Sequence, residues 1–305
     1  MSGTVTVTAP AKINLSLGVG QRRPDGFHAL ATVYQAIGLY DQVTVREADD
    51  VTVTVRGEAR LAVGDVPTDA TNIAARAALL LAGHHGLERG VAVVIDKGIP
   101  VAGGMAGGSA DAAAALVACD QLWDLHTPKQ ELAELAAELG SDVPFALVGG
   151  TAIGSGRGEV VIPLMTRGEY WWVVLESALG LSTPAVYREF DALHDGAVVQ
   201  DPEIPDALMK ALRGHDVADL GAALSNDLQR AAFRLRPELE AALHTGRMGS
   251  AFGAILSGSG PSCLFLCEGR SHAVQVAANL TSQGLGPVSF APGPVHGARV
   301  VAREA

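Results

Sequence analysis

The chain has 305 residues, of which 48% are hydrophobic and 18% charged, and its formal net charge is −11 at pH 7. This much apolar material can build a buried core, so an intrinsically disordered chain is excluded, and the length fits one large or two ordinary domains. General binding of RNA or DNA needs a basic face that an acidic chain does not supply, although a local basic pocket for one phosphorylated metabolite remains open.

Cysteines and apolar runs exclude further classes of protein. Cys119, Cys263 and Cys267 are too few and odd in number for a disulfide framework, and the last two lack the additional ligands of a zinc site. Residues 248–267 carry no charge, but glycines and Pro261 interrupt them, which is wrong for a membrane helix. The first residues lack a basic segment followed by an apolar run, so no signal peptide is predicted. We therefore expect a cytoplasmic protein with no membrane partner.

Strands and helices mix along the first half of the chain. Residues 4–9 alternate with period two, which predicts a strand, and residues 42–57 predict two strands around an acidic turn. Residues 71–86 predict a helix that Thr71 or Asn72 caps. A strand at 91–97, a glycine-rich loop and a helix at 110–123 follow.

The clearest local helix signal lies at residues 127–140. Thr127 and Gln130 have the spacing of a capping box, and Pro128 suits the first helical position. Gly140 suits the C-terminal end of the helix.

A new buried strand is predicted at residues 169–177, and the break at 163–168 before it is a candidate domain boundary. We therefore expect domains at 1–165 and 166–305. The second half adds helices near 184–193, 205–213, 216–223, 237–245 and 271–283 and strands at 253–258 and 262–268. Because the elements follow no strict βαβ repeat, the predicted fold class is α+β.

The stretch "PVAGGMAGGSADAAAAL" at residues 100–116 concentrates glycines before a helix. Gly103 and Gly108 have the glycine spacing of a Walker A loop, but Ser109 stands where that loop needs lysine, and no register gives a dinucleotide fingerprint. Glycines nevertheless let backbone N–H groups converge on an anion at the positive end of a helix. We expect Ser109 to cap the helix and treat it as a candidate phosphate or metal ligand. Two interpretations stay open: a phosphate loop, or a helix start packed tightly against another backbone.

Three stretches resemble the motifs of the GHMP small-molecule kinases, which include galactokinase, homoserine kinase and mevalonate kinase. They are "APAKINLSLGVGQRRPDGFHAL" (9–30), "PVAGGMAGGSAD" (100–111) and "AILSGSGPSCLF" (254–265). The resemblance spans most of the chain. It implies a ribosomal-protein-S5-like N-terminal domain, a ferredoxin-like C-terminal domain, an active site in the cleft between them, and ATP with Mg²⁺ as cofactors.

One member family of these kinases resembles the chain more closely. It phosphorylates the 2-hydroxyl of a cytidine diphosphate-linked methylerythritol in non-mevalonate isoprenoid biosynthesis. The residues that carry this resemblance are the "PAKINL" and "RRPDGFH" segments of the first motif, "LGSDVPF" (139–145) and "STPAVY" (182–187). The resemblance therefore implies a small-molecule acceptor as partner, and we expect a monomer or a weak homodimer without nucleic acid.

Lys12 and Asp142 are the implied catalytic pair. Without the resemblance, Lys12 would be read as a surface lysine with a buried stem, and Asp142 as the N-cap of a following helix. The resemblance implies that Asp142 takes the proton of the attacking hydroxyl as general base. It also implies that Lys12 lies beside Asp142, where an ammonium would keep the carboxyl ionised and steady the transferring phosphoryl charge.

The other implied site residues fall into two sets. Cytosine offers a hydrogen-bonding edge and two π faces, which suits recognition by aromatic rings and an imidazole. The acceptor set is Asn14, Phe27, His28, Thr183 and Tyr187. The ATP set is Asn72, Lys97, Pro100, Val101, Ala102, Gly103, Gly104, Met105, Ala106, Gly107, Gly108 and Ser109. Phe27 stands where the member family usually has tyrosine, and its type alone favours a core position. No residue beyond Ser109 is predicted as a metal ligand.

Two rival functions remain from the sequence. A sister kinase acting on homoserine, mevalonate or a sugar would not need the rings of Phe27, His28 and Tyr187. A non-catalytic nucleotide-binding or protein-interaction module would not need both Lys12 and Asp142. RNA binding is disfavoured by the net charge of −11.

Overall fold

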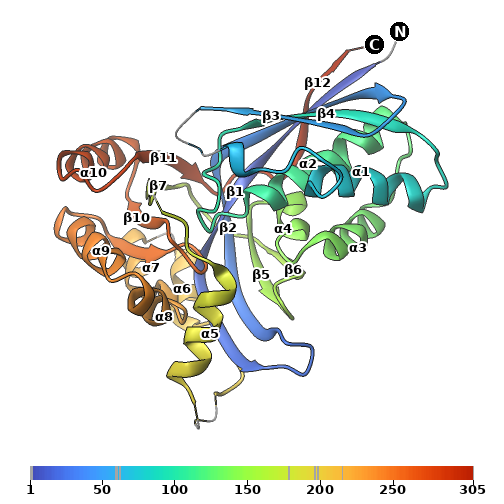
Figure 1. Cartoon of the computed structure of the whole chain (residues 1–305). Coiled ribbons are helices and arrows are strands. Elements are labelled where there is room, and N and C mark those ends of the chain that lie inside the picture. The colour runs from blue at the N-terminus through green and yellow to red at the C-terminus, as the bar shows by residue number, and fades with distance from the viewer. Residues whose placement is uncertain are drawn as a thin grey trace.

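The computed structural model describes residues 3–58, 61, 63–177, 179–195, 197, 199–214 and 216–304. Two sheets and the helices packed on them make up the fold. Figure 1 shows the first sheet with helices α1–α4 on one side of the molecule and the second sheet with α5–α10 on the other. None of the helices in these ranges is long and apolar enough to cross a bilayer.

A long hairpin dominates the first sheet. β1 (Thr4–Arg22) pairs antiparallel with β2 (His28–Ala48). Buried and partly buried residues alternate at the start of β1, but from Ala9 to Leu17 every residue is buried. This happens because the strand passes from the core of the first sheet into that of the second, where Leu17 packs. Period two therefore predicts only the first third of the strand.

The remaining strands extend this sheet on both sides of the hairpin. They are β3 (Thr52–Gly57), β4 (Gly90–Lys97), β5 (Thr151–Ser155), β6 (Val160–Leu164), β8 (Ser225–Asn226) and β12 (Arg299–Glu304).

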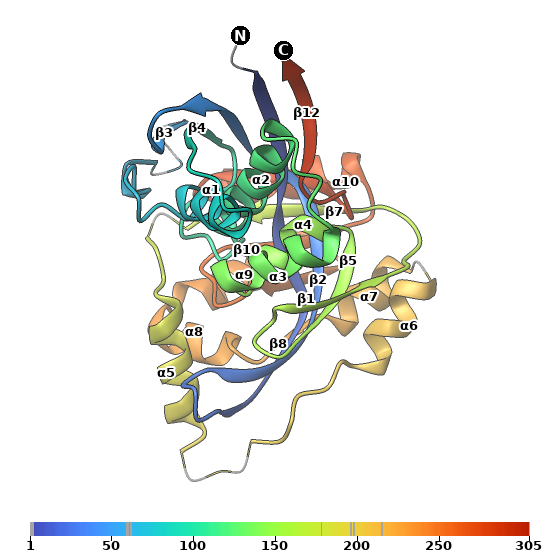
Figure 2. The ribbon, with the colours of Figure 1, turned by 90° about the vertical axis from the view of Figure 1, so that its right-hand side faces the viewer.

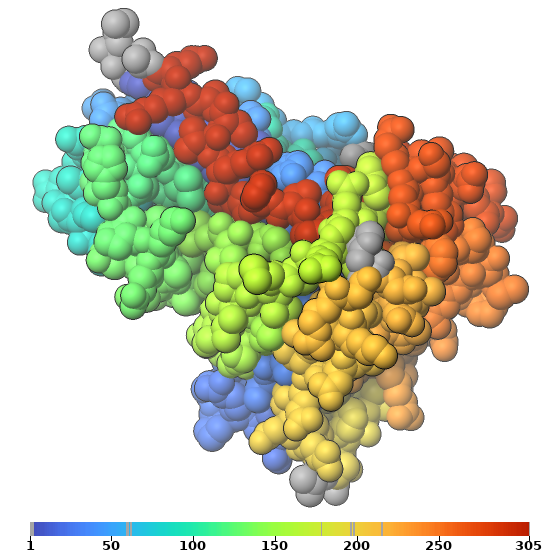
Figure 3. Space-filling model, turned by 180° about the vertical axis from the view of Figure 1, so that it is seen from behind, coloured from blue at the N-terminus to red at the C-terminus, as the bar shows by residue number. Residues whose placement is uncertain are grey.

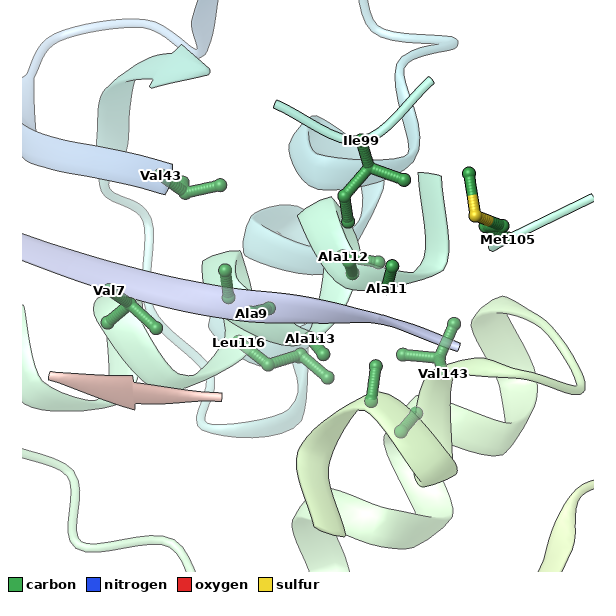
Figure 4. Packing of buried hydrophobic residues seen from close by; sticks show 14 of the residues in the cluster. Val7, Ala9, Ala11, Val43, Ile99, Met105, Ala112, Ala113, Leu116 and Val143 are labelled. Carbon is green, nitrogen blue, oxygen red and sulfur yellow. The ribbon is translucent and has the colours of Figure 1, made fainter. Parts of the chain in front are cut away.

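One helical layer covers the first sheet, as Figure 2 shows. It consists of the short 3-10 helix η2 (Val63–Asp65), α1 (Ile73–His84), α2 (Gly107–Leu122), α3 (Lys129–Leu139) and α4 (Val143–Val148). The alanines of α2 are fully buried, and their small side chains let the helix lie close to β1. Figure 4 shows Ala112, Ala113 and Leu116 beside Ala9 and Ala11. The alanine run is thus explained by close packing of α2.

The second sheet has the strand order β11-β7-β10-β9 and is antiparallel throughout. Its strands are β7 (Tyr170–Leu175), β9 (Gly253–Leu256), β10 (Cys263–Cys267) and β11 (Val288–Gly293). Its helices are α5 (Thr183–Leu193), α6 (Asp206–Gly214), α7 (Val217–Ala223), α8 (Gln229–Leu235), α9 (Glu238–Met248) and α10 (Arg270–Ser282). In chain order the strands lie fourth, first, third, second, with helices between β7 and β9 and between β10 and β11, which is a ferredoxin-like arrangement.

Segments of the second half return to the first sheet. β12 pairs antiparallel with β1, and β8 pairs parallel with Ser16 and Leu17 of the same strand. Figure 3 shows the C-terminal residues running across the first half of the chain, close to its N-terminal end. The two halves of the chain therefore meet along β1.

Two predicted helix caps are wrong. Ser109 does not cap α2, because the helix begins earlier, at Gly107, and the N-cap residue is Ala106 in the left-handed conformation (φ 57°). Thr127 does not begin a capping box, because Pro128 is the N-cap residue of α3 and the Thr127 hydroxyl is 2.9 Å from the His85 ring nitrogen Nε2. A tertiary contact has replaced the local one in the second case.

Candidate active site

Two cavities meet at the glycine loop. The hairpin cavity, of about 600 Å³, is lined by β1, the β1–β2 turn, β2, Asp142, α5 and the loop between β9 and β10. The loop cavity, of about 410 Å³, is lined by residues 100–108, the start of α1, Lys97 and Asp111. Gly104 and Ala106 line both cavities. A group held in one cavity can therefore reach the other across these two residues.

The glycines of the loop do two different jobs. A Cβ on Gly103 would lie 2.9 Å from Ser262 Oγ, and one on Gly104 would lie 2.4 Å from the Ser257 carbonyl oxygen. Gly104 also has φ +74°, a conformation that side chains strongly disfavour. A Cβ on Gly108, by contrast, would meet nothing nearer than Ile73 at 3.7 Å. Gly104 thus packs against another backbone and Gly103 against the Ser262 side chain, whereas Gly108 leaves backbone open toward the loop cavity.

Hydrogen bonds fix this loop to both halves of the chain. The Lys12 backbone N–H donates to the Met105 carbonyl oxygen (3.0 Å), and Ser257 Oγ donates to the Gly104 carbonyl oxygen (2.9 Å). Met105 itself is a core residue with 1% exposure. Among the predicted ATP residues, Met105 therefore anchors the loop through its buried side chain. The neighbouring glycines have no side chain and present only backbone to the loop cavity.

Lys12 and Asp142 lie together in the hairpin cavity. Lys12 Nζ is 3.5 Å from Asp142 Oδ2 and donates a hydrogen bond to Asn14 Oδ1 (3.1 Å). Asn14 in turn donates to Thr32 Oγ1 (2.8 Å). Lys12 is only 6% exposed, so the alternative of a surface lysine is wrong. The hairpin strands β1 and β2 and, much later in the chain, the residue before α4 contribute to this polar chain.

The Asp142 carboxyl is free of a capping role. Asp142 is the N-cap residue of α4 by position, but its side chain makes no capping hydrogen bond. It faces Lys12 instead, and the Tyr34 ring lies beneath the ammonium, with its centroid 5.1 Å from Lys12 Nζ. Burial and the nearby Asp142 raise the pKa of Tyr34 well above its usual value, so its hydroxyl stays protonated. Sequence reasoning missed Tyr34, which sits buried on β2 between ordinary strand residues.

The predicted acceptor residues line the other end of the hairpin cavity. Phe27 comes from the β1–β2 turn, His28 is the first residue of β2, and Thr183 and Tyr187 belong to α5. Phe27 is 51% exposed, so a core position for it is wrong, and the Arg157 guanidinium lies 4.9 Å from its ring centroid. Thr183 Oγ1 is 2.8 Å from Ser259 Oγ in the loop between β9 and β10.

Charged side chains that the sequence did not single out share this wall. Arg22, Arg157, Arg188 and Asp191 all line the hairpin cavity. The three arginines place positive charge in this wall although the chain as a whole is acidic. Cationic groups of this kind favour phosphate binding. Asp191 lies one helical turn after Tyr187, and that spacing on a helix is the signal that could have pointed to it.

Lys97 and Asn72 have structural partners at the loop cavity. Lys97 Nζ is bonded to Asp41 Oδ2 and to Asp111 Oδ2 (2.7 Å for Asp111), and Asp41 Oδ1 accepts the backbone N–H groups of Gly98 and Ile99. Asn72 caps α1 through the Ala74 N–H (2.8 Å), as predicted. Both residues line the loop cavity, where they also fix the shape of its wall. Ser109 lines neither cavity in the part of the chain that the structure describes.

Two segments of the chain match family models. Residues 72–150 match the GHMP kinases N terminal domain, and residues 208–285 match the GHMP kinases C terminal. A protein of Nocardioides sp. named 4-diphosphocytidyl-2-C-methyl-D-erythritol kinase is 55% identical over 293 residues, which are 96% of this chain and 98% of that relative. A protein of the same name from Nocardia farcinica is 52% identical over 301 residues, with 98% of this chain and 97% of the relative covered.

Solved structures resemble the same fold. A crystal structure of 4-(cytidine 5'-diphospho)-2C-methyl-D-erythritol kinase has a TM-score of 0.77 and 32% identity, and the match covers 95% of this chain and 99% of that one. The homoserine kinase from Cytophaga hutchinsonii has a TM-score of 0.75 at 19% identity, over 98% and 97% of the two chains, and this likeness concerns the fold alone. The predicted α+β GHMP kinase fold is confirmed by these matches.

Proposed function

This chain belongs to the 4-diphosphocytidyl-2-C-methyl-D-erythritol kinase family of the GHMP kinases, and we propose that it transfers the γ-phosphoryl group of ATP to the 2-hydroxyl of 4-diphosphocytidyl-2-C-methyl-D-erythritol. The products are ADP and the 2-phosphate, a step of non-mevalonate isoprenoid precursor biosynthesis. The observation that carries the proposal is the Lys12–Asp142 pair, 3.5 Å apart, next to the residues that the two cavities share.

The loop cavity suits the ATP phosphates. Backbone N–H groups at the start of α2 and the positive end of that helix favour an anion, and the open side of Gly108 leaves room for it. The γ-phosphoryl group would then approach Gly104 and Ala106, which also line the hairpin cavity. The predicted ATP residues thus serve mainly through backbone and cavity shape.

Asp142 would take the proton from the attacking 2-hydroxyl, which makes its oxygen nucleophilic toward the γ-phosphorus. The Lys12 ammonium keeps the carboxylate ionised before the proton moves, and it stabilises the negative charge on the transferring group. Asn14 holds the ammonium in place through its Oδ1 atom. The protein supplies positioning and charge, without a covalent intermediate.

The other end of the hairpin cavity suits a cytidine diphosphate group. Phe27 and Tyr187 offer ring faces for the base, and His28 offers a ring nitrogen for its edge. Arg157, stacked on Phe27, offers positive charge toward the diphosphate. Thr183 lies nearer to the transfer point, through its contact with Ser259.

Mg²⁺ is part of the proposal only as the ion that accompanies ATP. The described residues contain no group of three His, Cys, Asp or Glu side chains that could hold a metal ion. Ser109 stays a candidate ligand for it. The three cysteines are free and buried, which supports a location in the reducing cytoplasm. We also propose a domain boundary near residues 165/166 and a monomeric or weakly dimeric protein.

An ADP-release assay tests this function. Purified protein, ATP and Mg²⁺ are combined in separate reactions with 4-diphosphocytidyl-2-C-methyl-D-erythritol, homoserine, mevalonate and galactose. Turnover with the first acceptor alone is the expected result. Turnover with another acceptor would keep the phosphate-transfer machinery but contradict the cytidine pocket, and absence of turnover with all four would favour a non-catalytic nucleotide-binding module.

A further inference from the structure

The His28 ring is held on three sides within the wall of the hairpin cavity. Its centroid lies 5.0 Å from that of Tyr187, with the rings tilted by 29°, and 6.0 Å from that of Phe190, edge to face. The side chain is 5% exposed. These contacts restrict the orientation of the ring, and its hydrogen-bonding pattern depends on which nitrogen carries the proton.

Asp191 supplies the third contact. Its Oδ1 atom lies 2.8 Å from His28 Nε2, so these two residues, 163 positions apart in the sequence, form a direct hydrogen bond. Asp191 is on α5, one turn after Tyr187 and next to Phe190, so the same helix provides the stacking ring and the carboxylate. The carboxylate lines the cavity as well.

The direction of this hydrogen bond decides whether the other nitrogen of His28 donates to or accepts from a bound base. A carboxylate is an acceptor only, so Nε2 must donate its proton to Asp191. In the neutral imidazole the other nitrogen, Nδ1, then carries a lone pair and accepts a hydrogen bond. We propose that Asp191 is a positioning residue that selects cytosine over uracil by fixing this state of His28.

The two bases differ at the atom that matters. Cytosine carries an amino group at position 4, which donates hydrogen bonds, whereas the corresponding group of uracil is a carbonyl oxygen, which accepts them. An Nδ1 atom that accepts a hydrogen bond pairs with the amino group of cytosine. With uracil, the lone pair of Nδ1 would instead face a lone pair of the carbonyl oxygen, and no hydrogen bond could form. A site that leaves polar atoms unmatched in this way rejects the wrong ligand strongly. Asp191 therefore sets base selectivity without touching the reacting atoms.

This inference rests on the proposed function, because it assumes that the hairpin cavity receives the cytidine diphosphate end of the acceptor. Its test uses binding alone, so it does not depend on turnover. CDP and UDP are titrated into the protein by calorimetry, with excess ADP to fill the loop cavity. The ratio of the two Kd values is the readout, because general damage to the fold weakens both ligands together.

The wild-type protein is expected to bind CDP at least about tenfold more tightly than UDP, the worth of one matched hydrogen bond. Asp191→Ala should bring the two Kd values within about threefold of each other, since His28 is then free to present a donor to uracil. Asp195→Ala removes the same charge from an exposed position four residues on and should keep the wild-type ratio. In a His28→Ala background, Asp191→Ala should change the ratio no further, because Asp191 acts through His28.

Three results would overturn the inference: an unchanged ratio in Asp191→Ala, an equal loss of both affinities, or no preference for CDP in the wild type. In each case, turnover of the cytidine-linked acceptor by the wild-type protein would leave the proposed function standing. Absence of that turnover, with the CDP preference and its loss in Asp191→Ala observed, would instead contradict the proposed function alone.

Discussion

The two cavities are built from different materials. The glycine-rich residues 100–108 make up much of the lining of the loop cavity, whereas larger side chains from β1, β2 and α5 line the hairpin cavity. Backbone N–H groups recognise a phosphate whatever molecule carries it, but only side chains distinguish one acceptor from another. This difference explains why a glycine motif indicates phosphate transfer without naming a substrate, and why acceptor identity depends on scattered residues such as His28 and Tyr187.

The largest expected effect comes from a substitution in the glycine-rich loop. In Gly104→Ala the new Cβ would lie 2.4 Å from the Ser257 carbonyl oxygen and 2.6 Å from that of Gly260, at a φ of +74°. We expect the unfolding free energy to fall by about 3 kcal/mol or more, from the clash and the strained conformation together. Urea denaturation measures this loss.

Gly108→Ala is the matched control for that substitution. Its Cβ has open space around it, inside a helix where alanine is favoured, so the unfolding free energy should change by less than about 1 kcal/mol. ATP should nevertheless bind more weakly, because the methyl group enters the loop cavity. Equal stability losses in the two variants would contradict the division of the loop into a packed part and an open part.

A second change tests the side-chain wall. Tyr187→Ala should raise the KM for the acceptor by about tenfold, which corresponds to the 1–2 kcal/mol typical of an aromatic contact with a base, and leave the KM for ATP unchanged. Phe252→Ala removes an aromatic ring of the second half that lines neither cavity and serves as the control. An unchanged acceptor KM in Tyr187→Ala would remove this ring from acceptor recognition.

A smaller effect concerns the Asp111 carboxyl, which lines the loop cavity. Burial, together with the nearby Asp41, raises the pKa of Asp111 well above its usual value. The native state therefore keeps a proton that the unfolded chain has already lost, so this group makes the unfolding free energy fall as pH rises from about 4 through the native pKa. Asp111→Asn removes the titration.

Relative to the wild type, Asp111→Asn should thus become more stable as pH rises from 4.5 to about 7.5, because the variant lacks the group whose native pKa is raised. Urea denaturation at both values measures it, with the exposed Asp50→Asn as control. A difference between variant and wild type that stays constant with pH would contradict the assigned direction.

The sequence predicts the local elements better than the contacts between them. Hydrophobic period and turn residues locate α1, α3 and α5 to within a few residues. They do not predict the full length of β1, because a strand buried on both faces loses its alternation. Two predicted caps also fail, at Ser109 and Thr127, where backbone geometry and a contact with His85 take over.

For the candidate site, motif resemblance identified Lys12 and Asp142, and the structure brings them within 3.5 Å. Residues that position other site residues belong to no recognisable sequence motif. Asp191, Tyr34 and Asp41 lie in ordinary helix or strand sequence, and their importance arises only when β1, β2 and α5 come together. Tertiary contacts of this kind are not encoded in any short stretch of sequence.

The central claim is that the two cavities bind the two substrates while Lys12 and Asp142 act between them. The most direct measurement compares kcat with the Kd values for ATP and acceptor in Asp142→Asn. We predict that kcat falls by about 10²-fold or more, as for the loss of a general base, while both Kd values stay within about threefold of the wild type. A near-normal kcat would contradict the account, because the hydroxyl would then lose its proton without Asp142.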